Sequence, residues 1–335
     1  MNGEPQSDAD HLLQLLGGKH RAQALSTAAA LGLADLLARG PRPVAELAGD
    51  LGCDRAGLES LLRLLAGLEF VSEPAPDVFA LTTRGRTLCR DQLGPLAEFV
   101  GTPQQWDPWA RLRDGLRSGQ PAFDRTFGVP LYAALARDPD AAACYDRAID
   151  AFTRHEAIGL GDRLDLANAR VVVDVGGGRG TLLLELLGAW PQLRGILFDL
   201  PHVADATRAR LEAAAPGRVE ARGGDFFAAV PAGADVYLLK HVLHNWDDDR
   251  AVRLLANCGA AMAADGRVIA ICAVLAPDNR PDLARLLDLE MRVLTGGRER
   301  RKPELRRLFA AAGLALTRVE PLTAASWLLV GQRPK

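Results

Sequence analysis

Several features that mark particular protein classes are missing from this sequence of 335 residues. Its 40 basic and 42 acidic residues give a net charge of only −2, so no overall field attracts nucleic acid or acidic lipid. Its five cysteines are scattered without a CxxC pair, which argues against a disulfide framework and a zinc finger. No apolar run reaches the roughly 18 residues that a membrane-spanning helix needs. We therefore expect a protein with no nucleic-acid and no membrane partner.

Lysine is also scarce, because only four of the 40 basic residues are lysines and the others are arginines. Lys240 lies in an apolar segment and therefore requires an explanation. The first ten residues, MNGEPQSDAD, are polar and acidic, unlike a secretory signal peptide, so we expect a cytoplasmic location. The chain is long enough for two domains, and its 48% hydrophobic composition is sufficient for each to have its own core.

Residues 1–95 are predicted to form helices followed by a hairpin. Apolar helices are expected over residues 10–37, and two short amphipathic helices over Pro43–Leu51 and Asp54–Leu68, with Asp54 as an N-cap. The segment FVSEPAPDVFALT then predicts two strands around a Pro/Asp turn. This order is typical of a winged helix.

A winged helix raises the alternative of a transcription regulator that senses a small molecule. Residues 1–95 hold nine bases and twelve acids, whereas a DNA-binding module normally presents a basic face. The expected recognition helix is mostly leucine, which suits a dimer interface better than a major groove. We therefore favour a dimerisation domain over residues 1–95.

The rest of the chain divides into two regions. Residues 96–160 are predicted to be helical, with breaks at Pro and Gly, and they carry many of the aromatic residues. In residues 161–335, short apolar runs alternate with helical stretches; they are ARVVVDVG, GILFDL, DVYLLK and GRVIAICAV. Such alternation predicts a parallel sheet covered on both faces. Two more strands, in LALTRVE and SWLLVGQ, are expected to close the sheet as a hairpin.

A glycine-rich turn follows the first of these strands. Gly176, Gly178 and Gly180 form GxGxG, and Thr181 stands where the dinucleotide fingerprint has its third glycine. This shorter pattern lets the backbone approach an amino-acid-sized group, whose carboxylate would sit near a helix N-terminus. A tight strand–helix turn with no ligand is the alternative reading.

Acidic residues after the next strands favour the ligand. Asp199 ends a strand 21 residues past Gly178, where a carboxylate would accept hydrogen bonds from ribose hydroxyls, or would cap the next helix. Asp225 would bind an adenine amino group and Phe226 would cover the ring, or the two would be a polar turn with a core aromatic. Together these positions predict a nucleoside with an amino-acid tail, which is S-adenosylmethionine.

The segment LLKHVLHNWDDD carries the candidate chemistry. Lys240 would bind the cofactor or substrate, or extend its ammonium to solvent. His244 is a candidate general base because imidazole titrates near neutrality, and Trp246 offers a flat surface or belongs to the core. His241, His244 and Asp248 would share one face of a helix and could be metal ligands, but no second ligand cluster is present. We expect no metal.

Five motifs give the chain a family resemblance: DVGGGRGTLLLELL, FDLP, GDFF, LLKHVLHNWDDD and GGRERRKPELRRLFAAAGL. They resemble the small-molecule O-methyltransferases that include plant caffeate and flavonoid enzymes, and more closely the bacterial enzymes that methylate aromatic polyketides, anthracyclines and enediyne-associated acids. The resemblance implies an α/β fold with a Rossmann-like seven-stranded methyltransferase sheet and an N-terminal winged-helix domain that forms a homodimer.

The resemblance also implies roles for individual residues. His244 would be the catalytic base and Glu299 the acid that orients it. The residues implied for S-adenosylmethionine are Asp174, Gly176, Gly178, Asp199, Leu200, Asp225, Phe226, Lys240 and Trp246. Apart from the resemblance, helices over residues 96–160 and Leu283–Thr295 are expected to form the walls of an apolar substrate pocket. The candidate residues, for each of which ordinary core packing is the alternative, are Trp106, Trp109, Phe123, Phe152, Asp288, Met291 and Arg292.

This sequence departs from the family pattern at three positions. Asn245 follows the base where the family usually has Asp, and Cys272 stands where a second glutamate often flanks the histidine. Glu299 is then the only obvious acid partner of His244. His241 replaces the more usual Trp or Ser. The first two departures keep open an alternative, in which the same S-adenosylmethionine pocket serves hydroxylation or decarboxylation.

The expected reaction is an in-line methyl transfer to a phenolic hydroxyl of a polyketide-type aromatic intermediate. The enzyme must align the oxygen and assist loss of its proton, since a phenol with a pKa near 10 is mostly protonated at pH 7. His244 would accept that proton while Glu299 holds the other ring nitrogen. The exact acceptor is not encoded in any motif.

Overall fold

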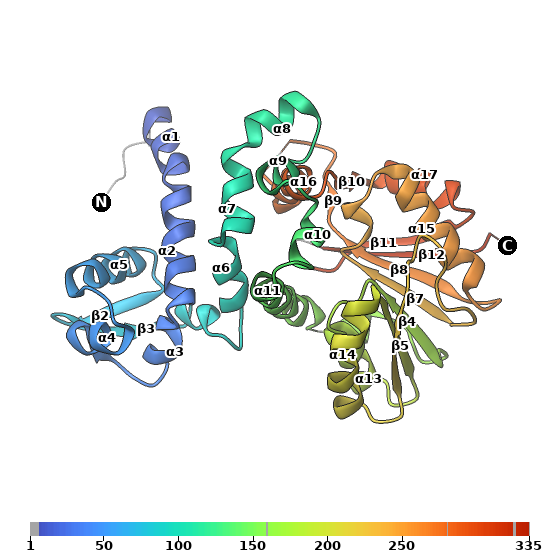
Figure 1. Ribbon diagram of the computed structural model, residues 1–335, viewed down its shortest axis with the longest axis horizontal. Helices are drawn as coiled ribbons and strands as arrows, with labels where there is room; N and C mark the ends of the chain where they lie inside the picture. The colour runs from blue at the N-terminus through green and yellow to red at the C-terminus, as the bar shows by residue number, and fades with distance from the viewer. Residues whose placement is uncertain (1–6, 159, 280, 324–325, 335) are drawn as a thin grey trace. The chain divides into compact units, whose positions relative to one another are not determined.

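The computed structural model describes residues 7–158, 160–279, 281–323 and 326–334. The chain forms two compact units (Figure 1). The first unit comprises the chain up to Trp106 together with Asp138–His155, and the second comprises Asp107–Arg137 and the chain from Glu156 onward. The segment 96–160, which we expected to be one helical region, is therefore divided between the units.

The first unit is built from helices and one small sheet. Its helices are α1 (Asp8–Leu16), α2 (Gly18–Ala30), α3 (Leu33–Leu37), α4 (Val44–Leu51), α5 (Arg55–Gly67), the 3₁₀ turn η1 (Gly85–Leu88), α6 (Gly94–Val100), the start of α7 (Pro103–Ala110) and most of α11 (Pro139–Ala157). Its strands are β1 (Arg42–Pro43), β2 (Val71–Ala75) and β3 (Val78–Leu81), in the order β1-β3-β2.

The local sequence explains this arrangement. Asp54 caps α5 as expected, because its carboxylate accepts a hydrogen bond from the Gly57 amide at 2.7 Å. The predicted apolar helices over residues 10–37 are present, and Gly32, whose φ is 67°, separates α2 from α3. Phe79 and the leucines of α4 and α5 form the core of the unit. The helix–turn–helix–hairpin order of a winged helix is present as predicted.

The second unit contains a seven-stranded sheet. Its strands are β4 (Val171–Val175), β5 (Arg194–Asp199), β6 (Val219–Gly223), β7 (Val236–Lys240), β8 (Arg267–Cys272), β11 (Ala315–Pro321) and β12 (Trp327–Gln332), in the order β11-β12-β8-β7-β4-β5-β6. β4 to β8 are parallel, and β12 pairs antiparallel with both β8 and β11. The α/β fold and the terminal hairpin are confirmed.

One strand was not among the apolar runs read from the sequence. β6 has the sequence VEARG, in which only Ala221 is fully buried. It lies at the edge of the sheet and pairs only with β5, so it needs less apolar surface than the central strands. A search for apolar runs therefore misses it.

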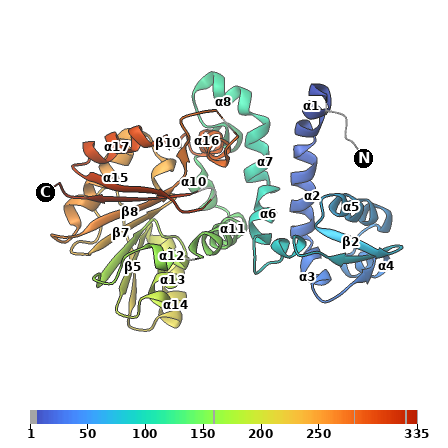
Figure 2. The ribbon, with the colours of Figure 1, turned by 180° about the vertical axis from the view of Figure 1, so that it is seen from behind.

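Helices cover both faces of this sheet (Figures 1 and 2). The helices on these faces are α13 (Thr181–Ala189), α14 (Pro201–Ala214), α15 (Asp248–Ala261) and α17 (Lys302–Ala311). The other elements of the second unit are α8 (Leu112–Ser118), α9 (Ala122–Phe127), α10 (Leu131–Leu135), α12 (Leu160–Arg163), η2 (Leu243–Asn245), α16 (Leu283–Leu294) and the short pair β9 (Val274–Leu275) and β10 (Arg300–Arg301).

Alternate strand residues face the two helical layers. Val173 and Tyr237 pack with α15 and α17, whereas Val172 and Leu238 pack with α13 and α14. Each fully buried large apolar side chain stabilises the fold by roughly 1.5–3 kcal/mol. The direction of the strand order reverses between β7 and β4. In open α/β sheets, ligands bind at the carboxyl ends of the strands beside such a reversal.

None of the helices in the described ranges has the length and apolarity that a bilayer-crossing segment requires.

Candidate functional site

The glycine loop connects β4 to α13 at the carboxyl edge of the sheet. Gly176, Gly178 and Gly180 have φ values of 71°, 57° and 73°, a backbone region that side-chain-bearing residues rarely adopt. A Cβ on Gly177 would come within 2.5 Å of the Asp174 carboxyl group. The loop therefore needs glycine both for its turns and for its close passage over Asp174.

Asp174 is a buried carboxyl group beneath this loop. It is 2% exposed, and its Oδ2 has no hydrogen-bond partner. Burial and the nearby charge of Asp199 raise the pKa of Asp174 to about 7, while Lys240 acts in the opposite direction. Buried polar atoms normally have partners, so an orphaned carboxylate oxygen here is suited to a ligand that brings a donor or a positive charge.

Asp199 fastens the loop to the end of β5. Its Oδ2 accepts from the Gly178 amide at 2.8 Å, and its Oδ1 accepts from the Leu200 amide at 2.7 Å. Burial raises the pKa of Asp199, although both hydrogen bonds act against that rise. The carboxylate lies next to the glycine loop, at the position where the sequence predicts a ribose contact.

An aromatic cluster lies beyond β6 and β7. The ring centroid of Phe227 is 4.7 Å from Phe226 and 4.9 Å from Trp246, in edge-to-face geometry. The Trp246 Nε1 is buried without a hydrogen-bond partner. Asp225, at the start of this cluster, is exposed, and its Oδ1 accepts from the Phe227 amide at 2.8 Å.

Together, these features fit a nucleoside that carries an amino-acid tail. The orphaned Asp174 oxygen and the side-chain-free loop suit the tail, Asp199 is adjacent to them, and the aromatic cluster offers a surface for a base. The structure thus gathers at one edge the cofactor residues predicted from four separate strand ends.

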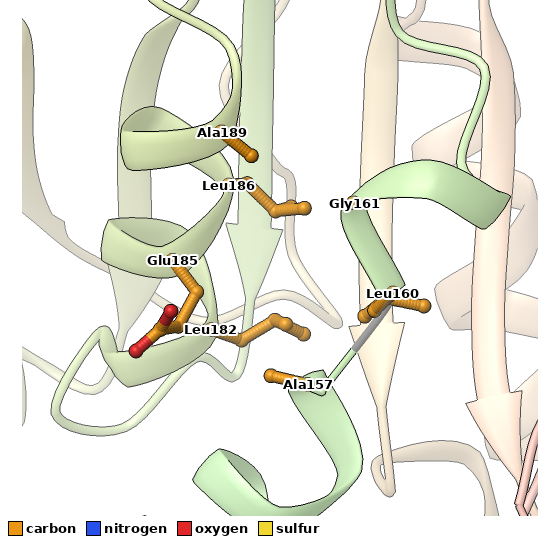
Figure 3. A pocket seen from close by; sticks show the side chains of 7 residues that line it. All are labelled: Ala157, Leu160, Gly161, Leu182, Glu185, Leu186 and Ala189. Atoms are coloured by element: carbon orange, nitrogen blue, oxygen red, sulfur yellow. The ribbon is translucent and has the colours of Figure 1, made fainter.

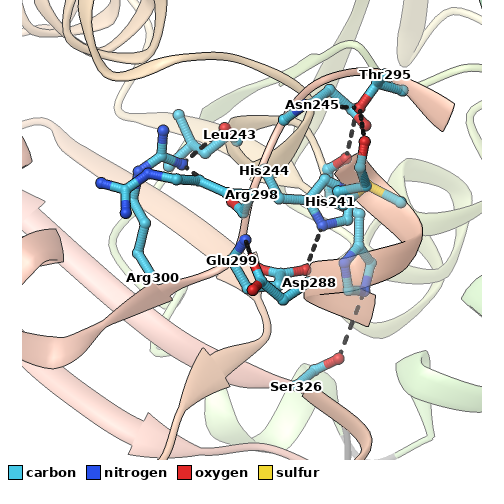
Figure 4. A network of polar contacts seen from close by, with 12 residues as sticks. His241, Leu243, His244, Asn245, Asp288, Thr295, Arg298, Glu299, Arg300 and Ser326 are labelled. Atoms are coloured by element: carbon cyan, nitrogen blue, oxygen red, sulfur yellow. Dashed lines mark hydrogen bonds and ion pairs between the residues drawn. The ribbon is translucent and has the colours of Figure 1, made fainter. Parts of the chain in front are cut away.

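His244 and Glu299 form a buried pair on the neighbouring turn. The Nδ1 of His244 lies 2.6 Å from Glu299 Oε1, and the two residues are 8% and 2% exposed. Because Nδ1 faces a carboxylate, its proton is held there and Nε2 is left as the proton acceptor. The expected contact between these two residues is present (Figure 4).

The segment 297–300 clamps the turn that carries His244. The Arg298 amide donates to the His244 carbonyl at 2.8 Å, and the Glu299 amide donates to Asp288 Oδ1 at 2.9 Å. A Cβ on Gly297 would lie 1.9 Å from the His244 carbonyl oxygen. Only glycine permits this approach, which sets the distance between the two segments.

Arg300 completes the clamp from the other side. Its guanidinium is 2% exposed and donates to the carbonyls of Leu243 and Trp246 at 3.1 and 2.8 Å. It also pairs with Asp248 at 2.8 Å. These contacts flank His244 in the chain, so Arg300 fixes the backbone while Glu299 fixes the ring (Figure 4).

A second buried carboxylate lies beside the first pair. Glu156 contacts Lys240 Nζ at 2.7 Å and His241 Nε2 at 3.0 Å, and it accepts a hydrogen bond from Ser326. The ring of His241 lies 5.2 Å from that of His244. Lys240 is therefore buried in an ion pair and does not reach solvent, which excludes one of the two readings of its sequence position.

The suggestion that His241, His244 and Asp248 share one helix face is wrong. His241 lies in a bend with a φ of 54°, His244 is in the 3₁₀ turn η2, and Asp248 begins α15. Asp248 pairs with Arg298 and Arg300, and His244 with Glu299. Among the described residues no group of three or more His, Cys, Asp or Glu side chains could hold a metal ion.

The departures Asn245 and Cys272 have structural consequences. The Asn245 amide donates to the His241 carbonyl at 3.1 Å, which closes the turn between the two histidines. Cys272 is buried, and burial together with the charge of Glu299 raises the pKa of its thiol. A neutral thiol there leaves Glu299 as the carboxylate that contacts His244.

The substrate candidates are distributed over both units. Trp106 and Phe152 belong to the first unit, and the others to the second. Phe123 on α9 is fully buried and lies 4.6 Å from the Phe127 ring. Trp109 donates to Glu290 on α16 at 2.6 Å. Of the three candidates on α16, Asp288 contacts the Glu299 backbone, Met291 is half-buried and Arg292 is exposed. Substrate contact stays a prediction for all of them.

A shallow cavity of about 210 Å³ lies between α12 and α13 (Figure 3). Its lining residues are Ala157, Leu160, Gly161, Leu182, Glu185, Leu186 and Ala189. None of them belongs to the predicted cofactor or substrate set, so this cavity adds nothing to the site.

Sequence reasoning missed three residues of this region: Glu156, Arg300 and Ser326. Arg300 lies in the motif that contains Glu299, so its position gave a usable signal. Glu156 and Ser326 lie in segments without a motif. Glu156 is 85 residues before His241 in the chain, and Ser326 is 85 residues after it. Only the folded arrangement brings them to the histidine.

Profiles of two protein domains match the sequence. An O-methyltransferase domain matches residues 109–315, and an O-methyltransferase dimerisation domain matches residues 13–91. The chain is 39% identical over 327 residues to phenazine O-methyltransferase PhzM of Lysobacter antibioticus, with 96% of this chain and 95% of that protein covered.

Solved structures show the same likeness. The structure of LaPhzM superposes with a TM-score of 0.92 at 37% identity, covering 98% of this chain and all of that one. CalO1, a methyltransferase in calicheamicin biosynthesis solved with S-adenosylhomocysteine bound, has a TM-score of 0.85 at 35% identity, with 98% and 100% covered.

Proposed function

This chain belongs to the O-methyltransferase family, and we propose that it transfers the methyl group of S-adenosylmethionine to a phenolic hydroxyl of an aromatic natural-product intermediate, with His244 as general base. The resemblance recognised in its motifs is thereby confirmed. The named relatives act on phenazine and in calicheamicin biosynthesis, which supports a small aromatic acceptor. The proposed base and the phenolic acceptor rest on the chemistry of the site.

The carboxyl edge of the sheet is the proposed cofactor site. Asp174, with Gly176 and Gly178, would hold the amino-acid tail, and Asp199 beside Leu200 the ribose. Asp225, Phe226 and Trp246 would contact the adenine. The orphaned Asp174 oxygen, which requires a donor, supports this assignment most directly.

Proton removal is the step for which the chain supplies its own chemistry. When bound, S-adenosylmethionine supplies a methyl group on a positively charged sulfur. A phenol with an ordinary pKa near 10 keeps its proton at pH 7 and is then a poor nucleophile. The His244 Nε2 accepts that proton, and Glu299 stabilises the imidazolium through Nδ1–H. The imidazolium afterwards returns the proton to solvent.

The buried His244–Glu299 contact at 2.6 Å is the observation that carries this function. We expect His244→Ala to lower turnover by on the order of 10²–10⁴, because one general base is lost while alignment remains. Turnover is measured as S-adenosylhomocysteine release with a panel of hydroxylated aromatics, and cofactor affinity by calorimetry.

Affinity for the cofactor is the control for that experiment. His244→Ala should keep it, and His20→Ala, a change at an exposed histidine of α2, should keep both affinity and turnover. If His244→Ala loses cofactor affinity together with turnover, the residue is structural and the proposed base is wrong.

A homodimer is the proposed assembly. The match to a dimerisation domain supports it, as do four exposed leucines on α1, namely Leu12, Leu13, Leu15 and Leu16, which are 56% to 66% exposed in one chain. Apolar side chains gathered on one short helix favour burial against another surface.

A further inference from the structure

One buried cation at the site has two buried carboxyl groups within its electrostatic range. Lys240, at the end of β7, pairs with Glu156 at 2.7 Å, and the two side chains are 8% and 2% exposed. Asp174 lies on the adjacent strand β4, opposite Leu238 and two positions before Lys240 in the register. Its Oδ2 has no partner. The ammonium of Lys240 therefore forms an ion pair with the Glu156 carboxylate, to which no sequence motif pointed.

Glu156 is held in place from three different parts of the second unit. Lys240 ends β7, Ser326 precedes β12, and Glu156 itself lies near the end of α11. The two oxygens of Glu156 lie 3.0 and 3.1 Å from His241 Nε2, and Ser326 Oγ donates to the same carboxylate. Lys240, His241 and Ser326 therefore fix the position of this negative charge.

Buried charges favour pairing, because an unpaired ion in a low-dielectric interior loses its hydration without compensation. If Glu156 lost its charge, Lys240 would be left with Asp174 as the buried carboxyl group on the neighbouring strand. A Lys240–Asp174 pair would occupy the oxygen that the cofactor requires.

We propose that Glu156 is a positioning residue that keeps Lys240 paired, so that the Asp174 carboxylate stays open to the cationic amino group of S-adenosylmethionine. This inference rests on the proposed function, since it requires the cofactor tail to bind at Asp174. Under this proposal Lys240 does not contact the cofactor directly. Its ion pair with Glu156 instead leaves Asp174 available to the cofactor.

The charges around the cluster agree with this division of roles. Burial raises the pKa of Glu156, but His241 and Lys240 outweigh burial and hold it below its usual range. Burial and Lys240 lower the pKa of His241, so its neutral ring donates from Nε2. Burial and the charge of Asp199 raise the pKa of Asp174, and the opposite effect of Lys240 does not cancel that rise.

The test is a double-mutant cycle read by the affinity for S-adenosylhomocysteine in calorimetry at pH 8. Glu156→Gln keeps the shape of the side chain and removes its charge, and should weaken binding on the order of 10–100-fold. The same change in a Lys240→Met background should alter affinity by less than about twofold, because the competing cation is gone. Equal losses in both backgrounds, or no loss in the first, would overturn the proposal.

A pH titration supplies a readout that a structural defect would not move. The affinity of the wild-type chain should rise as Asp174 ionises near pH 7. In Glu156→Gln this rise should move to lower pH, because a Lys240–Asp174 pair keeps the carboxyl ionised. An unmoved titration together with weaker binding would assign Glu156 a purely structural role.

Two further variants complete the comparison. Glu156→Asp keeps the charge and should bind within about threefold of wild type; a loss as large as that of Glu156→Gln would contradict the proposal. Glu320→Gln removes a half-buried carboxylate that pairs with Arg318 at 2.6 Å on β11, and should bind like wild type. If the wild-type chain does not bind S-adenosylhomocysteine, both the proposed function and this inference fail. If the wild-type chain binds it and Glu156→Gln binds equally well, only this inference is refuted.

Discussion

At the scale of single residues, the site depends on which atom of each group holds a proton. The His244 ring can accept a substrate proton only while its Nδ1–H donates to Glu299. Asp174 can attract a cationic amino group only while it is ionised. Both conditions are set by buried partners a few ångströms away, and both can be altered without changing the shape of the site.

Replacing Glu299 by Gln tests the first condition. The amide of Gln would donate to His244 Nδ1, which moves the ring proton to Nε2 and blocks the accepting atom. We expect turnover to fall by on the order of 10²–10⁴ with cofactor affinity retained. Steady-state kinetics with calorimetry measures both; turnover within threefold of wild type would show that Glu299 does not orient the base.

The affinity of the wild-type chain for S-adenosylhomocysteine should depend on pH through Asp174. Its pKa is raised to about 7 by burial and by Asp199, so the carboxyl is protonated below that pH and ionised above it. Because the ligand's amino group is cationic, affinity should rise as pH increases through 7 and fall by up to about tenfold per pH unit below it. Calorimetry between pH 5.5 and 8.5 measures this.

Asp174→Asn is the matched variant, and it should bind weakly with no step near pH 7. The same raised pKa has the opposite effect on the cofactor-free fold. The folded chain keeps a proton on Asp174 that the unfolded chain releases near pH 4, so the contribution of Asp174 to stability decreases as pH rises from about 4 to 7. Thermal unfolding of the two proteins over that range should therefore show a difference that grows with pH.

At the scale of elements, the site consists of the turn after β7 and the segment 297–300 that clamps it. Arg298, Glu299 and Arg300 each contact a different part of that turn, through a backbone amide, a carboxylate and a guanidinium. The segment ends in β10, which pairs with β9 just beyond β8. The base is thereby tied to the strands of the main sheet.

Gly297→Ala tests the clamp. The added Cβ would lie 1.9 Å from the His244 carbonyl oxygen and 2.7 Å from Asn245 backbone carbon, so the two segments must separate. We expect a loss of about 1–3 kcal/mol in the free energy of unfolding, and a larger relative loss of turnover than of cofactor affinity. Denaturant unfolding and kinetics check this.

Gly188→Ala is the control for that experiment, because its Cβ meets nothing within 4 Å on the helix α13. It should leave turnover unchanged and stabilise the fold by up to about 1 kcal/mol. If the two alanine variants have the same turnover and the same free energy of unfolding, the close approach of Gly297 to His244 does not contribute to activity.

Elements with strong local patterns were predictable, and long-range partners were not. The apolar runs of β4, β5, β7 and β8 and the positive-φ glycines follow from local sequence. The charged edge strand β6 lacks that signal. The rarity of lysine singled out Lys240, but its partner Glu156 lies 84 residues away in a helix with no motif, and no spacing rule connects them. Arg300 was within a recognised motif, yet its carbonyl contacts depend on the fold of the turn.

At the scale of the whole molecule, the first unit provides an apolar helix that its own core does not use. No residue of α1 is buried within one chain, although four of the nine residues in its sequence DADHLLQLL are leucines. The dimerisation-domain match begins within this helix and includes its last residues, Leu13 to Leu16. The assembly is therefore where its apolar side chains are expected to be buried.

The double variant Leu13→Glu/Leu16→Glu should convert a dimer into a monomer that remains folded, because both side chains are more than 60% exposed in one chain. Light scattering gives the mass and circular dichroism the fold. Gln14→Glu adds charge on the same helix without removing apolar surface, and should stay dimeric. A wild-type monomer, or a dimeric double variant, would contradict this use of α1.

The strand order of the sheet has a consequence for how the protein is made. β12 is the last strand of the sheet to leave the ribosome, yet it lies inside the sheet between β11 and β8. Until Gln332 has been synthesised, the free edge of β8 offers its backbone amides and carbonyls to any extended segment nearby. The nascent catalytic unit therefore passes through a stage with an open, apolar sheet edge, during which a chaperone that shields such edges would raise the yield of active enzyme.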